Sequence, residues 1–335
     1  MGYFLAGDVG GTKTFLALYA ATALGYSLVR EQRFVSADYD DFAGIVADFL
    51  RSSGEQPQSA VFGVAGPVVG GRARMTNLGW LIDQDLLRER FQLAEVLLVN
   101  DLVAVAQAVS TLPPEDLSVV NGGTPIPQGS MAVIAPGTGL GEAYLCWNGT
   151  GYATFPSEGG HVDFAPNSKT EEALLSFLRA EYGHVSYELI CSGKGIPNIY
   201  RYLTQGAGMK VSPELQAALD AAADMAPVLM GQALGKTSEV ARLTLEIFFD
   251  VLAAEAGNMA IKFLATGGLY LGGGMLPKLI TAFDRKRFMA RFVSKGRMAG
   301  ILATIPVKII MTERAGLNGV ALAAFRALQE RQAKR

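Results

Sequence analysis

The sequence has few of the residues that disulfide or metal frameworks require. Among its 335 residues there are two cysteines, Cys146 and Cys191, and two histidines, His161 and His184. Two thiols cannot cross-link a chain of this length, so we expect both to be reduced and the protein to be cytoplasmic. The scarcity of Cys and His also argues against a structural zinc site.

The chain also lacks an excess of charge of either sign. The chain has 29 Lys and Arg against 31 Asp and Glu, a formal net charge of −2, which argues against a protein that binds nucleic acid through its phosphates. The longest uncharged run, 117–141, contains six glycines and three prolines and is therefore typical of loops and a strand rather than of a membrane helix. We expect neither a nucleic-acid partner nor a membrane segment.

Glycine is what the chain has in excess. The 39 glycines make up about 12% of the residues, against a usual ~7%, and they follow no collagen period. Half of the residues are hydrophobic, so a sizeable core is expected and wholesale disorder is excluded. The length suggests two domains or one large one, and the glycines are expected in tight turns.

The pattern of apolar residues predicts an α/β protein in two similar halves. Each half opens with three short strands, and the motif from Leu5 to Thr12 resembles that from Ile134 to Gly141, a weak repeat with a period of roughly 130 residues. The stretch 113–128 is the best candidate for a crossing between domains. The expected strands are 3–8, 14–20, 26–35, 60–64, 95–99, 131–135, 142–147, 152–155, 269–271 and 306–311. The expected helices are 40–51, one from Asp83 or Asp85 to about 90, 102–112, 171–181, part of 192–203, 239–264, 277–283 and 317–331.

Three glycine-rich turns follow predicted strands, at 7–12, 137–141 and 272–275. Without a Cβ, backbone N–H groups in such turns converge on phosphate oxygens. Neither the Rossmann nor the Walker pattern fits, because strands follow the first two turns and Lys13 comes after Thr12. A single turn is as well explained by a hairpin that binds nothing, but three together, with polar Asp8, Thr12 and Thr138, favour a nucleotide site.

Two further groups of polar residues are candidates for substrate chemistry. Asn100 and Asp101 end a buried strand, where a carboxylate can accept a proton from an attacking hydroxyl; alternatively, Asp101 only caps the following helix. Glu158 and His161 flank two glycines in a polar turn suited to sugar hydroxyls, although His161 is alternatively a hydrogen-bonded buried histidine. Glu188 lies at a probable helix start, where an ordinary surface glutamate is also expected.

Taken together, these motifs resemble those of bacterial glucokinases outside the zinc-containing ROK group, within the actin-like ATPase and hexokinase superfamily. The match runs in order from residue 3 to about 320; Lys13, Pro136 and Lys194 depart from the pattern and 203–240 matches poorly. The motifs are Gly7-Asp-Val-Gly-Gly-Thr, Thr76-Asn77, Val99-Asn-Asp101, Gly137-Thr-Gly-Leu-Gly141, Glu158-Gly-Gly-His-Val-Asp-Phe-Ala-Pro-Asn167 and Arg179-Ala-Glu-Tyr-Gly-His-Val-Ser186.

The resemblance implies two actin-like ATPase (ribonuclease H-like) α/β domains around a central cleft: a small domain of residues 1–112 with 317–335, and a large domain of 113–316. It also implies ATP-dependent phosphorylation of glucose at the 6-hydroxyl, in a homodimer, with Asp101 as the base. Asn77, Asn100, Glu158, His161 and Glu188 would bind the sugar. The residues implied for the nucleotide are Gly7, Asp8, Val9, Gly10, Gly11, Thr12, Gly137, Thr138, Gly139, Gly272, Gly273, Gly274 and Met275. Mg²⁺ would bind the phosphates, and Asp8 would reach it through water.

Three other functions remain open from the sequence. A kinase for another hexose or a related sugar would need only a small change at the sugar site, because one hydroxyl is often read by one side chain. An ATPase of the same fold without sugar chemistry would keep the glycine turns but not the Glu158–His161 motif. A sugar-responsive regulator would need a DNA-binding arm, and no such segment is recognised.

Overall fold

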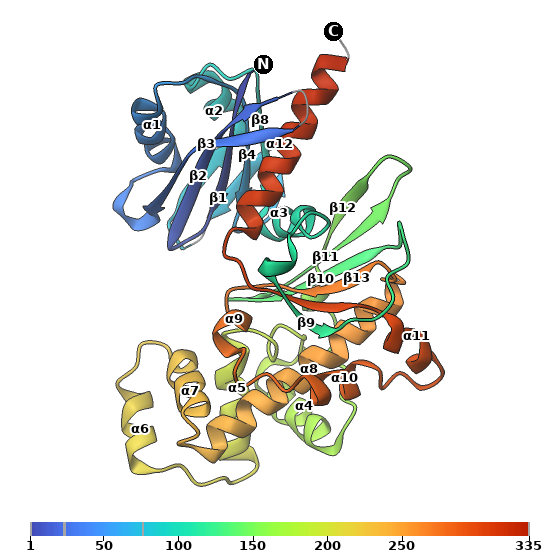
Figure 1. Ribbon diagram of the computed structural model, residues 1–335. Coiled ribbons are helices and arrows are strands. Elements are labelled where there is room, and N and C mark those ends of the chain that lie inside the picture. Colours follow the sequence, from blue (N-terminus) through green and yellow to red (C-terminus); the bar gives the residue numbers. More distant parts are fainter. Residues whose placement is uncertain (1, 23–24, 76, 334–335) are drawn as a thin grey trace. The chain divides into compact units, whose positions relative to one another are not determined.

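The computed structural model describes residues 2–22, 25–75 and 77–333; Thr76, part of one motif above, and the terminal positions 1, 334 and 335 lie outside the described residues. The chain divides into two compact units (Figure 1). The first comprises Met1–Pro113, Gly151–Pro156 and Thr312–Arg335, and the second comprises Pro114–Thr150 and Ser157–Met311. Each unit has its own sheet and its own hydrophobic core.

The first unit is an α/β structure with a five-stranded sheet in the order β3-β2-β1-β4-β8 and a small sheet β5-β6-β7. Its strands are β1 (Tyr3–Val9), β2 (Lys13–Ala21), β3 (Tyr26–Val35), β4 (Pro57–Val64), β5 (Val68–Val69), β6 (Arg72–Met75), β7 (Trp80–Asp83) and β8 (Glu95–Asn100). Its helices are η1 (Ser36–Asp38), α1 (Phe42–Ser53), α2 (Gln84–Arg90), α3 (Asp101–Ala108) and α12 (Ala315–Ala333).

The register of this sheet places the ends of three parallel strands at one edge. In β1 and β4, Asp8 lies opposite Gly63, and in β4 and β8, Val64 lies opposite Asn100. The carboxyl ends of parallel strands are where α/β proteins bind ligands. Residues that are about 90 positions apart in the sequence therefore meet here.

The two faces of this sheet are covered by different helices. Successive side chains of a strand point to opposite faces, and Leu5 accordingly joins the buried cluster with α1 residues such as Phe49, while Phe4 joins the cluster with α12 residues such as Val320. Figure 1 shows α12 lying across β1 and β4. The apolar face expected for the last helix is confirmed, since Leu317, Val320, Ala321, Ala324 and Leu328 are all buried.

The second unit is built around α8, a 24-residue helix that is buried along most of its length. Its strands are β9 (Leu117–Asn121), β10 (Met131–Pro136), β11 (Leu140–Trp147), β13 (Gly268–Leu271) and β14 (Val307–Ile310). Its helices and helical turns are η2 (Pro114–Asp116), η3 (Gly159–His161), α4 (Lys169–Tyr182), α5 (Gly195–Arg201), η4 (Tyr202–Gly206), α6 (Pro213–Asp220), α7 (Met225–Leu234), α8 (Glu239–Lys262), α9 (Leu276–Leu279), α10 (Arg285–Phe292), η5 (Gly296–Met298) and α11 (Ala299–Thr304). The sheet order is β12-β11-β10-β13-β14-β9, with β12 (Tyr152–Ser157) at one edge.

Most expected elements lie within a few residues of their predicted positions, whereas the helices α6, α7, α10 and α11 and the strand β9 were not expected. α3 ends at Ala108 rather than at 112. The helix expected over 277–283 is only the single turn α9. The small sheet β5-β6-β7 was not expected, because its strands have only two to four residues and show little periodicity.

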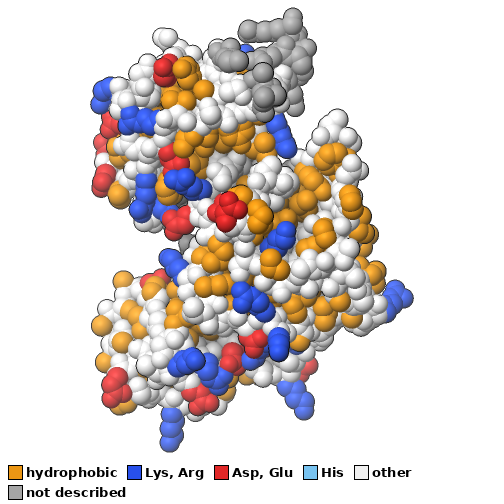
Figure 2. Space-filling model, viewed as in Figure 1, with side chains coloured by type: hydrophobic (Ala, Val, Ile, Leu, Met, Phe, Trp, Pro, Cys, Tyr) orange, Lys and Arg blue, Asp and Glu red, His pale blue; other side chains and the backbone are white. Residues whose placement is uncertain are grey.

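The surface agrees with the balanced composition. Figure 2 shows Lys and Arg side chains interspersed with Asp and Glu side chains on the visible face. In the part of the chain that the structure describes, no helix has both the length and the apolar content that a membrane crossing requires. Cys146 and Cys191 are both unpaired.

The contact between α12 and α3 gives a stability prediction. A Cβ added at Gly319 would lie 1.7 Å from the carbonyl oxygen of Ala104, so the helices approach more closely than any other residue would allow. We expect Gly319→Ala to lower the free energy of unfolding by about 1–3 kcal/mol or more, measured by urea denaturation. Gly231→Ala is the matched control: Gly231 lies inside α7 with open space around it, and the same change should raise stability by roughly 0.5–1 kcal/mol. Equal effects at both positions would contradict the close-packing argument.

Candidate functional site

The predicted site residues fall into two groups, one in each unit. The group in the first unit lies at the edge where β1, β4 and β8 end and contains Gly7, Asp8, Val9, Gly10, Gly11, Thr12, Asn77, Asn100 and Asp101. The group in the second unit contains Gly137, Thr138, Gly139, Glu158, His161, Glu188, Gly272, Gly273, Gly274 and Met275.

Asp8 is a partly buried carboxyl group in an environment that opposes its charge. Burial, and then the nearby Asp101 carboxylate, raise the pKa of Asp8 to about 7, with Lys13 opposing the shift. The Asp8 carboxyl also lies against the first turn of α12, since a Cβ on Gly316 would be 2.6 Å from Asp8 Oδ2. Lys13 itself forms an ion pair with Glu313. Asp8 and Asp101 therefore interact electrostatically at one edge of the sheet.

Asn100, not Asp101, is the capping residue of α3. Its Oδ1 accepts hydrogen bonds from the backbone N–H groups of Leu102 and Val103, at 2.9 and 3.3 Å, and its Nδ2 donates to the carbonyl of Gly66. The alternative in which Asp101 serves only as the cap is therefore wrong. An amide group has two N–H donors, and Asn100 uses them for the Gly66 carbonyl and for the Asp101 carboxylate.

Asp101 occupies the first helical position of α3 and also accepts a hydrogen bond from Leu102 N–H. Burial raises the pKa of Asp101, and hydrogen bonds from backbone N–H groups and from the Asn100 side chain partly offset this. A carboxylate that is more basic than usual is better suited to accept a proton than an exposed aspartate. The local chemistry of Asp101 is that of a general base.

The first glycine turn is a tight hairpin between β1 and β2. Gly10 N–H donates to the carbonyl of Lys13, and the Ser36 hydroxyl donates to the carbonyl of Gly10. Asn77, which is exposed, lies beside this turn: a Cβ on Gly11 would be 3.4 Å from Asn77 Nδ2. The turn thus brings a second amide side chain near the glycines that are expected to bind phosphate.

The second glycine turn, between β10 and β11, is held by the segment that carries Glu188. Gly137 N–H donates to the carbonyl of Gly139, and Gly193 N–H donates to the carbonyl of Gly137, each at 2.8 Å. Glu188 Oε2 accepts a hydrogen bond from Leu140 N–H at 2.9 Å. The expected helix start at Glu188 is wrong, because the residue lies in a turn and the next helix, α5, begins at Gly195.

The Glu158–His161 turn is exposed and is tied to the same segment. Glu188 N–H donates to the carbonyl of Gly160, and His161 N–H donates to the carbonyl of Glu158. The Glu158 and His161 side chains are 85% and 59% exposed, and the distance between Glu158 Oε2 and His161 Nε2 is 3.8 Å. The alternative of a buried, hydrogen-bonded His161 is therefore wrong, and both side chains are available to a ligand.

A pocket of about 580 Å³ opens beside the second glycine turn, a volume typical of small-ligand sites. Gly137, Thr138 and Met275 line it, whereas Gly272, Gly273 and Gly274 do not; the turn after β13 still lies beside β10, since Gly272 N–H donates to the carbonyl of Ile134. The other lining residues are Gly193, Lys194, Pro197, Ala223, Asp224, Met225, Ala226, Pro227 and Met230.

Sequence reasoning missed most of that lining. Five of its residues lie between 223 and 227, and a sixth, Met230, follows in α7, all in the part of the chain that matches the family pattern poorly. Their only signal is the apolar content of α7, which is typical of an ordinary core helix. Lys194 is the cation of the pocket lining.

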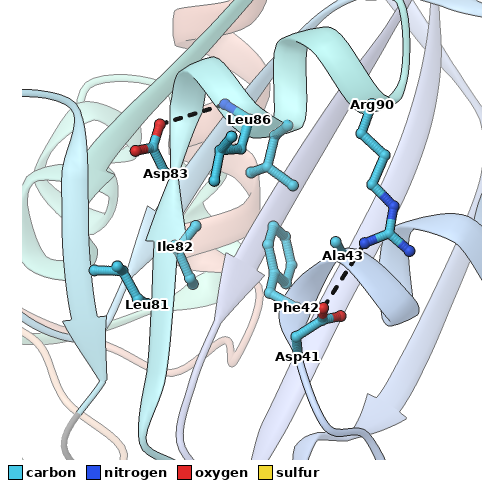
Figure 3. Close-up of a pocket in the computed structure, with 9 residues that line it drawn as sticks. Asp41, Phe42, Ala43, Leu81, Ile82, Asp83, Leu86 and Arg90 are labelled. Carbon is cyan, nitrogen blue, oxygen red and sulfur yellow. Dashed lines mark hydrogen bonds and ion pairs between the residues drawn. The ribbon is translucent and has the colours of Figure 1, made fainter.

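A second, smaller pocket lies in the first unit, between the start of α1, β7 and α2 (Figure 3). Its volume is about 130 Å³, below the usual size for a small-molecule site. Asp41 and Arg90 form an ion pair across it at 3.7 Å, and Leu81 and Leu86 lie at its rim. None of the predicted site residues lines this pocket, and we assign it no function.

The carboxylates of the first unit fit a hydrated cation better than a metal bound entirely by protein. In the described ranges, no group of three or more His, Cys, Asp or Glu residues is placed to hold a metal ion. Asp8 and Asp101 are two interacting carboxyl groups. Mg²⁺ is commonly held by one or two carboxylates together with water and substrate phosphates, so these residues fit that ion.

Comparisons with known proteins give one consistent result. The family model described as glucokinase matches residues 5–327. The glucokinase of Nostoc punctiforme is 37% identical over 340 aligned residues, which cover 97% of this chain and all of the relative. The glucokinase of Pectobacterium atrosepticum is 34% identical over 317 residues, which cover 95% of each chain.

Solved structures of glucokinases have the same fold as this chain. A glucokinase from an Antarctic psychrotroph superposes with a TM-score of 0.86 at 30% identity, covering 97% of this chain and 99% of that one. The glucokinase of Balamuthia mandrillaris, solved in complex with glucose, has a TM-score of 0.74 at 22% identity, covering 96% and 93% of the two chains, and shows the fold only. The α/β, actin-like ATPase fold expected from the sequence is confirmed.

The raised pKa of Asp8 predicts a pH dependence of stability. Because the folded-state pKa of about 7 lies above the ordinary 3.8, the folded state binds the proton more tightly than the unfolded state. The wild type should therefore lose unfolding free energy relative to Asp8→Asn as pH rises from 3.8 to about 7, by at most about 1.4 kcal/mol per pH unit, and the difference should level off above that. Urea denaturation at pH 5, 6, 7 and 8 measures it.

The exposed Asp40→Asn serves as the control, and its difference from the wild type should not follow this curve. A wild type that gains stability over Asp8→Asn between pH 5 and 7 would contradict the assigned environment of Asp8.

Proposed function

Because this chain belongs to the glucokinase family, we propose that it catalyses ATP-dependent phosphorylation of D-glucose at the 6-hydroxyl, giving glucose 6-phosphate and ADP. The observation that carries the proposal is the environment of Asp101. This residue directly follows the parallel strand β8 and interacts with Asp8 of the first glycine turn, and burial makes its carboxylate more basic than usual. A phosphoryl transfer to an alcohol needs one such base and donors for the phosphates.

In the proposed reaction, the Asp101 carboxylate accepts the proton of the glucose 6-hydroxyl as the oxygen attacks the γ-phosphorus. The new O–P bond forms while the bond from the γ-phosphorus to the β,γ-bridging oxygen breaks, and ADP leaves. Asn100 caps α3 and so holds Asp101 at the start of the helix. The hydrogen bond from the Asn100 side chain to Asp101 orients the base, and Asn100 is also assigned to a sugar hydroxyl.

We assign the other substrate contacts as follows. Asn77, Glu158, His161 and Glu188 contact the sugar hydroxyls, with the exposed pair Glu158 and His161 offering an acceptor and a ring nitrogen. The hydrogen bond from Leu140 N–H to Glu188 leaves the second carboxylate oxygen of Glu188 for the sugar. The small domain would comprise 1–112 with 317–335, and the large domain 113–316.

The glycine turns would bind ATP. The pocket beside Gly137 and Thr138 has the volume and the apolar lining for a nucleoside, with Met225, Met230 and Met275 among its walls. Lys194 in the same lining supplies a positive charge for a phosphate. Mg²⁺, held by Asp8 through water, would neutralise charge on the phosphates when bound.

We also propose that the protein forms a homodimer and works in the cytoplasm. The dimer rests on the family resemblance alone. The location rests on the two cysteines, which are unpaired. Light scattering coupled to size-exclusion chromatography tests the dimer: a mass near 35.5 kDa at micromolar concentration would contradict it.

The base assignment predicts a split between binding and turnover. Asp101→Asn keeps the shape of the side chain but removes the base, so we expect kcat to fall by about 10²- to 10⁴-fold while the Kd for glucose changes only a few-fold. Steady-state kinetics and calorimetry measure the two quantities. Asp85→Asn, an exposed position in the same unit, should leave both unchanged. A kcat near that of the wild type in Asp101→Asn would exclude Asp101 as the base.

The choice of sugar is tested by a coupled ADP-release assay with glucose, mannose, glucosamine and fructose, and with no sugar. We expect the highest kcat/KM with glucose and very slow ATP turnover without sugar, since water is a poor substitute for an oriented hydroxyl. Equal rates with and without sugar would indicate an ATPase without sugar chemistry. A higher kcat/KM for another sugar would identify a kinase for that sugar.

A further inference from the structure

A group of buried polar side chains in the second unit takes no part in the reaction above. Glu142, on β11, is 3% exposed, and Glu255, in the middle of α8, is fully buried. The two carboxyl groups interact electrostatically, since the Glu255 carboxylate raises the pKa of Glu142. Two neighbouring buried carboxyl groups are costly unless one of them is neutral.

Glu255 is the carboxylate with partners. Its Oε2 accepts a hydrogen bond from Asn258 Nδ2 at 2.7 Å, and its Oε1 lies 3.4 Å from Lys262 Nζ. Asn258 in turn contacts the hydroxyl of Tyr187 and accepts a hydrogen bond from Lys295 Nζ. These contacts stabilise a negative charge on Glu255.

Glu142, in contrast, lies in surroundings that disfavour a negative charge. Among the described residues, no group hydrogen-bonds to its Oε1. Burial, and then the Glu255 carboxylate, raise the pKa of Glu142 to about 8, with Lys262 opposing. Further titratable groups lie in this region: the ion pair of Glu171 with Arg291, and the thiol of Cys191. Burial, and then the carboxyl groups of Glu255, Glu142 and Glu171, raise the pKa of Cys191. At pH 7 Glu142 is therefore mostly neutral.

The second carboxyl oxygen of Glu142, Oε2, packs on the Glu158–His161 turn. A Cβ on Gly159 would lie only 1.8 Å from Glu142 Oε2, so the carboxyl group rests directly on the backbone of Gly159. Gly159 follows Glu158 and begins the helical turn that contains His161. A shift of the Glu142 carboxyl group therefore changes the position of both side chains that we assign to the sugar.

We propose that Glu142 is a positioning residue for sugar binding: its neutral carboxyl group supports Gly159 and holds the Glu158–His161 turn in the conformation that binds glucose. The proposal rests on the proposed function. Deprotonation of Glu142 places a negative charge beside the Glu255 carboxyl group in a buried region, where Lys262 and Lys295 are the lysines that interact with Glu255. Repulsion between the carboxylates then displaces Glu142 and the turn that lies on it.

The test is the pH dependence of the KM for glucose, measured from pH 6.5 to 9.5 at saturating ATP in the wild type, Glu142→Gln and Glu255→Gln. In the wild type we expect this KM to rise above pH 8, by up to about tenfold per pH unit, while the KM for ATP stays constant. Glu142→Gln, which mimics the neutral acid, should have a KM near that of the wild type at pH 7 and no rise at high pH. Glu255→Gln should remove most of the rise, because it removes the carboxylate whose repulsion displaces the charged Glu142.

Glu172→Gln, the same change at an exposed glutamate of α4, is the matched control and should keep the wild-type profile. A KM for glucose that stays constant up to pH 9.5 in the wild type, or a rise that persists in Glu142→Gln, would overturn the proposal. If Glu142→Gln does not fold, Glu255→Gln decides: loss of the rise supports the proposal, and an unchanged rise overturns it. Failure of the proposed function is separate, because it would appear as a wild type without glucose-dependent ADP release.

Discussion

The parallel pairing of β1, β4 and β8 is the constraint on which the catalytic half of the first unit depends. Backbone hydrogen bonds set the register so that Asp8, Val64 and Asn100 reach the same edge of the sheet. The side chains that follow, on a hairpin and on the first turn of α3, inherit their positions from that register. The proposed base is thus positioned by main-chain geometry, which substitutions in neighbouring loops leave in place.

Both units hold carboxyl groups in surroundings that disfavour their charge. In the first unit, burial raises the pKa of Asp8 and of Asp101 beside the first glycine turn, while backbone N–H groups at the start of α3 offset part of the shift for Asp101. In the second unit, Glu255 has cationic and amide partners and Glu142 packs on Gly159. Such arrangements cost folding free energy, and in each unit they adjoin the residues assigned to substrate.

The excess of glycine has two physical roles in this chain. In the turns at 10–11 and 137–139 it lies where the chain reverses between two strands. At Gly319 and Gly159 it allows a carbonyl or a carboxyl oxygen to lie where a Cβ would be. Glycine count alone could not separate these roles, since a close approach between distant segments leaves no local pattern in the sequence.

The sequence by itself determined the α/β class, most strands and helices, the glycine turns and the candidate residues, because these follow from local periodicity and from motifs with fixed spacing. It offered Asp101 as the alternative helix cap, where the structure has Asn100, and it predicted the wrong local structure for Glu188. Both outcomes depend on which backbone groups the fold brings within reach. Only the tertiary structure placed α7 in the pocket lining and Glu142 against Gly159. Those contacts join segments whose separation in sequence carries no signal of their proximity.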